Sequence, residues 1–237
     1  MSLLLAESPL HAQRSGDGFL FGRPGAMLNV HGGLVRPNAS SELFDFVSDL
    51  LTIDSNDFVG GALGAGVYFP LSSRLDLDFR ATYSGSNTTS EFREFEGTDD
   101  LPIAQETQFI RVPLLAGVRY FITPRERTIG SLVWIPADYA LYGGVGAGAM
   151  WYRFRQVGEF VDFADNTTIF ADDLVSQGWS PAAQVTGGVD VAVSPRIGVN
   201  VEANYLWGRT SLDRDFEEFD KIDLSGFSAL VGISLRL

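Results

Sequence analysis

The sequence predicts an all-β fold, an eight-stranded antiparallel up-and-down transmembrane β-barrel with long loops at one end and short turns at the other. Eight segments alternate apolar and polar residues with the period of two that a β-strand requires. Long and short connections alternate between these segments, which is the pattern of an up-and-down meander. No other segment could cover the apolar side of eight strands. That side must therefore face either a ligand inside a closed barrel or lipid outside it.

The last third of the chain, residues 184–237, shows the alternation most clearly. Between residues 185 and 193, and again between 197 and 207, every second residue is apolar or small, while the other parity carries Asp190 and Glu202. Residues 227–237 repeat the apolar alternation. These three runs predict three consecutive strands of one antiparallel sheet.

The other strands and the domain boundaries follow from the same pattern. Further strands are expected at residues 26–35, 58–69, 75–83, 107–121 and 137–154. Long acidic loops are expected at residues 38–57, 84–106, 155–178 and 209–223, and the first of them has the spacing of a short amphipathic helix. Residues 26–237 are the expected barrel domain and residues 14–25 a periplasmic lead-in. Residues 1–13 resemble the tail of a secretory signal peptide, with a flexible N-terminus as the alternative.

Composition excludes several classes of function. With 17 basic and 30 acidic residues, the net charge of −13 argues against binding to nucleic acid and against docking on anionic lipid through charge. The absence of cysteine excludes a disulfide framework and thiol chemistry. No apolar run is long enough for a membrane-spanning helix. No loop has the spacing of an EF-hand, so neither a metal nor a cofactor is expected.

Aromatic residues on the apolar parity favour lipid outside the barrel. They gather near the two ends of the strands, with aliphatic residues between them. Phe69, Tyr120 and Tyr139 fall near the turn end, and Tyr83, Trp151, Tyr205 and Trp207 near the loop end. Two aromatic girdles around an aliphatic band suit two membrane interfaces, whereas a ligand-binding cavity would scatter its aromatic residues in depth.

The opposite parity carries charged residues well inside the strands. These are Asp76, Asp78, Arg80, Arg111, Arg119, Asp190, Glu202 and Arg236. Unpaired charge inside a narrow barrel is very costly, so these residues are expected to form a charge-paired polar plug, with glycines on the same parity leaving room for the arginines. A narrow gated ion path through the same charges is the alternative. His31 shares this parity and is expected to form hydrogen bonds in the lumen. The other interpretation, a catalytic base, lacks a nucleophile marked by spacing.

Together, the strand number, the alternating connections, the girdles, the signal-like leader and the apolar last strand resemble the OmpA/OmpX-like eight-stranded outer-membrane barrels of Gram-negative bacteria. The resemblance covers residues 26–237 and implies a monomer in the bacterial outer membrane, with periplasmic termini and extracellular loops. It also implies assembly by the barrel-insertion machinery. The family usually ends in an aromatic residue, whereas this chain ends in Leu237.

The predicted function is a structural or surface-interaction role without enzymatic activity. Expected partners are outer-membrane lipid, lipopolysaccharide bridged by divalent cations, and an extracellular protein that meets the acidic loops. The last loop is an example, with Asp213, Asp215, Glu217, Glu218 and Asp220. A narrow passive porin-like channel is the main alternative. A lipid-modifying outer-membrane enzyme and a soluble lipocalin-like carrier are the others.

Overall fold

The computed structural model describes residues 18–96, 101–130, 132–161 and 168–237. The predicted signal-peptide segment, residues 1–13, lies outside the described residues, as do the first four residues of the predicted lead-in. Among the described residues, no helix is long and apolar enough to cross a membrane.

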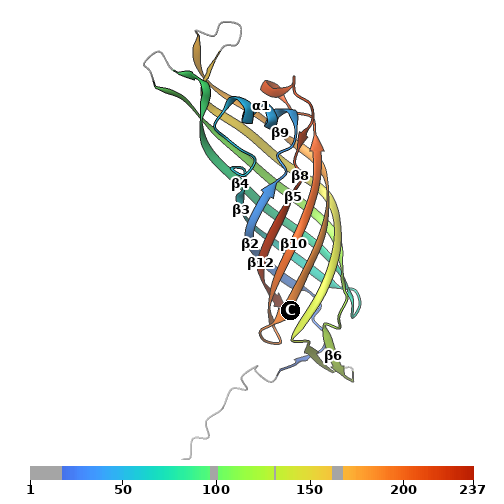
Figure 1. Ribbon diagram of the computed structural model, residues 1–237. Coiled ribbons are helices and arrows are strands. Elements are labelled where there is room, and N and C mark those ends of the chain that lie inside the picture. Colours follow the sequence, from blue (N-terminus) through green and yellow to red (C-terminus); the bar gives the residue numbers. More distant parts are fainter. Residues whose placement is uncertain (1–17, 97–100, 131, 162–167) are drawn as a thin grey trace, which may run out of the picture.

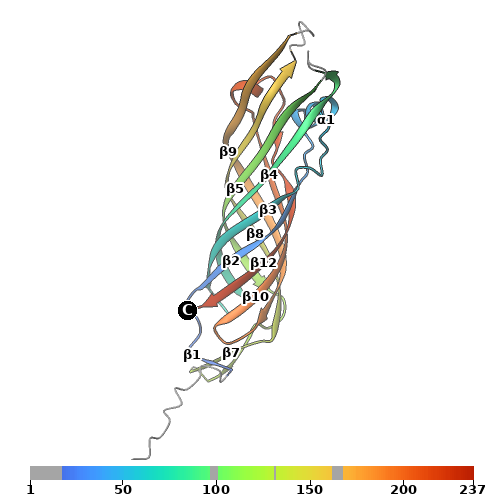
Figure 2. The same ribbon diagram turned by 90° about the vertical axis from the view of Figure 1, so that its left-hand side faces the viewer.

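Eight long strands form a closed antiparallel ring (Figures 1 and 2). They are β2 (Met27–Pro37), β3 (Gly60–Pro70), β4 (Leu75–Glu96), β5 (Pro102–Phe121), β8 (Tyr139–Val161), β9 (Ile169–Ala192), β10 (Ile197–Thr210) and β12 (Gly226–Arg236). Each strand pairs with its neighbours along the chain, and β12 pairs with β2 to close the ring. The predicted eight-stranded up-and-down barrel is confirmed.

Two of the expected long loops are strand instead, and this prediction was wrong. Above the barrel, β4 pairs with β5 and β8 pairs with β9 in two hairpins. We call residues 86–96 with 102–109 the first arm, and residues 152–161 with 169–178 the second arm; they rise from one end of the barrel, the arm end (Figure 1). Outward positions on the arms, such as Asn87 and Gln177, are polar and exposed, because strand beyond a membrane has no need of an apolar outer face.

A helix and a folded loop fill the concave side of the arms. Helix α1 (Glu42–Leu50), predicted from its amphipathic spacing, is confirmed. It buries Leu43, Phe44 and Val47. The connection from β10 to β12 adds a short 3-10 helix, η1 (Arg214–Phe216), and strand β11 (Ile222–Asp223). Helix α1 and this connection both contact inward-facing side chains of the arms, on β5 and β8 for α1 and on β8 for η1.

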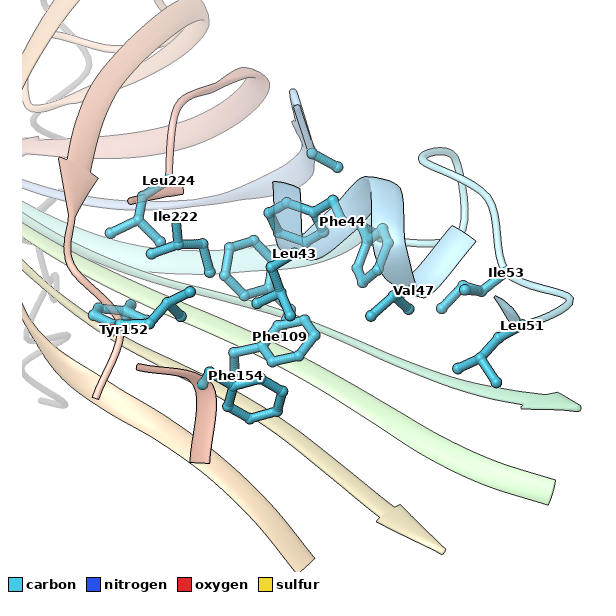
Figure 3. Packing of buried hydrophobic residues seen from close by; sticks show 14 of the residues in the cluster. Leu43, Phe44, Val47, Leu51, Ile53, Phe109, Tyr152, Phe154, Ile222 and Leu224 are labelled. Carbon is cyan, nitrogen blue, oxygen red and sulfur yellow. The ribbon is translucent and has the colours of Figure 1, made fainter. Parts of the chain in front are cut away.

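Together these elements make one apolar cluster, which we call the arm-end cluster (Figure 3). Its buried members are Ala39, Leu43, Phe44, Val47, Leu51, Ile53, Phe58, Phe92, Ile103, Phe109, Leu115, Met150, Tyr152, Phe154, Val161, Ala182, Leu212, Phe216, Ile222 and Leu224. Phe44 lies at its centre, with ring centroids 5.0 Å from Phe58, 5.4 Å from Phe109 and 5.8 Å from Phe154. The cluster holds α1 against the inner face of the arms.

The opposite end, the turn end, carries a smaller sheet. Strands β1 (Leu20–Phe21), β7 (Val133–Pro136) and β6 (Glu126–Ile129) pair in that order. We call this sheet the turn-end cap. It ties the lead-in to the connection between β5 and β8, and it lies below the barrel mouth near the C-terminus (Figures 1 and 2).

The F44A substitution is expected to lower the free energy of unfolding of the arm-end cluster by about 3 kcal/mol, because it leaves a cavity among three aromatic rings. Hydrogen exchange of residues 42–50 would measure this opening. F46A, on the same helix but 42% exposed, is the matched control and should change it by less than about 1 kcal/mol. Equal effects of the two substitutions would contradict this packing.

Candidate functional site: a sealed polar lumen

The two parities of the barrel strands face opposite environments. On the outer surface, Val145 is 59% exposed and Ile233 is 62% exposed, with aliphatic neighbours along each strand. On the inner parity, seven of the eight charged residues named above are buried and Asp190 is half-buried. A soluble carrier of apolar ligands would need its apolar parity inside the barrel and its charged parity outside.

One ion-pair network crosses the middle of the lumen. Arg80 on β4 donates from Nη1 to Glu202 Oε2 on β10 at 2.9 Å, and from Nε and Nη2 to the carboxylate of Asp78. The second oxygen of Glu202 accepts a hydrogen bond of 2.6 Å from the hydroxyl of Tyr142. Since β4 and β10 lie on opposite sides of the ring, this network closes the lumen across its width.

A second network lies nearer the turn end and includes a residue that the sequence did not indicate. Asp76 accepts hydrogen bonds from Arg119 Nη2 at 2.9 Å and from Arg125 Nη1 at 2.5 Å. The Arg119 guanidinium also lies over the ring of Tyr68, 3.5 Å from its centroid. Arg125 was missed because it belongs to the connection between β5 and β8. That the single carboxylate of Asp76 meets two arginines is apparent only once the strands are aligned.

The remaining predicted charges form two separate contacts. Arg236 Nη2 lies 3.4 Å from Asp190 Oδ2, and Arg236 Nη1 donates to the carbonyl of Ser194. Arg111 differs from the expected pairing, because among the described residues it has no carboxylate within 4.0 Å. Its Nη1 donates instead to the carbonyl oxygens of Leu224 and Ser225, at 2.7 and 3.3 Å. Arg111 thus marks the boundary between the charged lumen and the arm-end cluster.

His31 is held by hydrogen bonds on both sides of its ring. Nδ1 lies 3.0 Å from Asn29 Oδ1, and Nε2 lies 2.9 Å from Thr82 Oγ1. A Cβ at Gly64 would collide with this imidazole, so the glycine provides the space that the ring occupies. Thr82 and Asn29 make the contacts that a nucleophile and an orienting group would make with a catalytic histidine. The imidazole is buried inside the barrel, however, where these contacts satisfy both of its ring nitrogens.

The lumen is filled along its length. The arm-end cluster closes one end, the two ion-pair networks cross the middle, and the turn-end cap lies across the other end. In the cap, Trp134 donates from Nε1 to Glu126, and Glu126 pairs with Arg23 at 2.7 Å. A lumen cavity beside Asp78 and Arg80 measures about 10 Å³ and another beside Trp134 about 20 Å³. Each volume is about that of one water molecule.

The predicted girdle residues all lie on the outward parity. Phe69, Tyr83, Tyr120, Tyr139 and Trp207 are exposed, and Trp151 and Tyr205 are half-buried. The structure adds Trp179, which pairs directly with Trp151, and Phe227, which pairs with Tyr205. Trp179 was missed because it fell between the expected loop, which ends at residue 178, and the expected strand, which begins at residue 184. From Tyr139 to Trp151, about 12 residues tilted by about 40° correspond to roughly 30 Å of height, which is close to the thickness of a bilayer core.

No metal site is evident in the part of the chain that the structure describes, since no group of three or more His, Asp or Glu side chains is arranged to hold an ion.

Comparison with solved structures finds small outer-membrane barrels across most of the chain. Neisserial surface protein A is 11% identical with a TM-score of 0.45, covering 94% of this chain and 99% of its own. OprG from Pseudomonas aeruginosa is 14% identical with a TM-score of 0.46, covering 92% and 99%. Ail of Yersinia pestis is 12% identical with a TM-score of 0.45, covering 91% and 99%.

The closed ring of eight antiparallel strands with an apolar outer face is the architecture of a small transmembrane β-barrel. No protein-family model and no curated protein matches the chain. At such low identities and TM-scores the likeness assigns neither a family nor a role. The apolar outer band independently places the barrel in a bilayer, because a closed ring leaves no backbone group unpaired in lipid.

The R80Q substitution is expected to lower the free energy of unfolding by about 3–5 kcal/mol, because it leaves the buried carboxylates of Asp78 and Glu202 without a counter-charge. Urea unfolding in detergent, followed by tryptophan fluorescence, would measure it. The double variant R80Q/E202Q should recover part of the loss. R155Q, which removes an exposed ion pair with Asp173, should change stability little. Equal stability of R80Q and wild type would contradict the network.

Proposed function

We propose that the chain is a closed structural barrel that displays a folded surface outside the bacterial outer membrane. The observation that carries this proposal is the filling of the barrel from end to end, together with the packing of α1 against both arms. A barrel without an open path has no evident transport role. Its largest ordered feature beyond the apolar band is the pair of arms.

Acidic side chains cover the surface of the proposed display. Exposed examples are Glu91, Glu94, Glu106, Glu159, Asp172, Asp173, Asp213, Asp215, Glu217, Glu218 and Asp220. The hydrogen bond and the charge of Arg155 lower the pKa of Asp173, so this carboxylate stays ionised. Such a surface favours an extracellular protein partner with a basic face. In this proposal the barrel acts as a monomer, with the arm end outside the cell and both termini in the periplasm.

The arm end is proposed to face the outside because the long arms and α1 lie there, whereas the β3–β4 and β9–β10 connections at the turn end are short. The chain lacks cysteine, so single cysteines can report the orientation. Q177C, on the second arm, should react with a membrane-impermeant maleimide on intact cells. S73C, in the turn between β3 and β4, should react only after the cells are broken. Labelling in the reverse order would overturn the proposal.

A narrow channel is the second candidate, because charged side chains line the middle of the lumen. A conducting channel would require displacement of both ion-pair networks, of the arm-end cluster and of the turn-end cap. The wild-type protein is expected to give no discrete conductance steps in planar bilayers, since each of the two lumen cavities described above holds about one water. Steps in the wild type whose ion selectivity changes in R80Q/E202Q would favour the channel instead.

No catalytic role is proposed. His31 is fully engaged with Asn29 and Thr82 inside the barrel, at a position that lipid substrate cannot reach past the outer wall. Lipid turnover that depends on His31 would contradict this part of the proposal.

A further inference from the structure

Three cations lie on the outer surface at the arm end, at the level of the aromatic girdle or just beyond it. Arg209 follows Trp207 by two residues and so lies on the same side of β10. Arg36 is the direct cross-strand neighbour of Phe227. Lys221 immediately precedes β11, whose Asp223 pairs with Arg209. We call Arg36, Arg209 and Lys221 the basic rim.

The basic rim is not neutralised by the acidic surface around it. Within the described ranges, none of its three side chains has a carboxylate oxygen within 4.0 Å. Arg36 Nη2 donates to the side-chain amide oxygen of Asn56, and Arg209 Nε donates weakly, at 3.4 Å, to the carbonyl of Lys221. Higher on the second arm, by contrast, Arg155 is held by Asp173 at 2.6 Å. Arg93, on the first arm, has no carboxylate partner among the described residues either and donates to the carbonyl of Ser48. The basic rim differs from both arm residues in lying low, where the strands leave the membrane.

A groove of about 540 Å³ opens beside Arg209, the one member of the basic rim in its lining. Pro181, Ala183 and Trp207 line its apolar part, and Ser40, Arg209 and Asp223 line its polar part. Ala183 pairs directly with Trp207 within the girdle, whereas Ser40 and Asp223 lie beyond the end of the β10–β12 pairing. The groove thus changes from apolar to polar in the direction that leads out of the bilayer.

Asp223 is the one acid in the lining of this groove, and it is already occupied. Its carboxylate accepts hydrogen bonds of 2.9 Å from the Ser40 hydroxyl and from the backbone N–H of Ser225. Partial burial alone would raise its pKa, but the hydrogen bonds from Ser225, Ser40 and Asn38 outweigh burial and keep the pKa below its usual range. The neighbouring cations, Arg209 and Lys221, outnumber the single negative charge of Asp223. The Asp223 carboxylate can still accept a hydrogen bond from a sugar hydroxyl.

We infer that the groove and the basic rim bind the phosphorylated glycolipid of the outer leaflet, lipopolysaccharide. Its phosphate would meet Arg36, Arg209 and Lys221, and its sugar hydroxyls would meet Asp223. An acyl chain would lie on Trp207, Pro181 and Ala183. Guanidinium groups suit phosphate because they donate several hydrogen bonds in a fixed plane. The net charge of −13 argues against docking on anionic lipid, but the three cations of the basic rim outnumber Asp223, the acid in the groove lining.

This inference rests on the proposed orientation, in which the arm end faces the outer leaflet. The test is native mass spectrometry of the full chain in detergent with bisphosphorylated lipid A and with its dephosphorylated form. Wild type should retain the bisphosphorylated lipid. The variant R36Q/R209Q/K221Q should bind it at least about tenfold more weakly, since each cation near an anionic surface contributes appreciably.

A matched control removes three exposed cations from the turn end, R74Q/R127Q/R196Q, and should bind lipid A as wild type does. Equal binding by both triple variants, or equal binding of the dephosphorylated lipid, would overturn the inference and leave the closed barrel intact. A folded barrel gives a gel band whose migration changes on heating, that is, a heat-modifiable band. If the triple variant of the basic rim gives no such band, R209Q alone should still weaken binding. Unchanged binding by R209Q would also overturn the inference. Absence of a heat-modifiable band in wild type would contradict the barrel and the inference together.

Discussion

The structure depends on the pairing of charges inside a ring too narrow to hydrate them. Arg80 lies between Asp78 and Glu202, and Asp76 lies between Arg119 and Arg125. Each of these groups would be very costly to bury alone, so all must be present in the right register for the barrel to close. Because side chains alternate along a strand, fixing the charges inside also fixes the aliphatic residues outside. One constraint therefore sets both the lumen and the membrane-facing surface.

The same strands change character beyond the girdle. Along β5 and β8, the inward parity passes from Arg119 through Arg111 to Phe109 and Phe154, that is, from charged to apolar. The apolar inward residues need a partner that the ring does not supply, and α1 with the β10–β12 connection supplies it. The result is a barrel filled by ion pairs within the bilayer and by an apolar core outside it. Both kinds of filling support the proposed closed barrel, and the apolar core also packs the base of the arms.

Much of this arrangement could be predicted from the sequence, because lipid imposes a period of two on each strand. The ring of eight strands and the outward position of residues such as Tyr83 and Trp207 follow from that period. Helix α1 follows instead from the amphipathic spacing of its own residues. The arms could not be predicted, because strands with water on their outer face, as at Asn87 and Gln177, have the composition of loops. Arg125 and the shared cluster around Phe44 depend on contacts between distant segments. Alternation along one strand carries no information about such contacts.

The central claim is that the apolar parity faces lipid and the charged parity faces a dry, closed lumen. A single-cysteine spin-label scan of β10 from residue 197 to 207 in lipid bilayers tests it most directly, since the chain has no native cysteine. Labels at Val199, Val201 and Ala203 should collide freely with dissolved oxygen, whereas labels at Asn200, Glu202 and Asn204 should meet neither oxygen nor a water-soluble nickel reagent. Oxygen access at the second set, or nickel access along the whole lumen, would contradict the account.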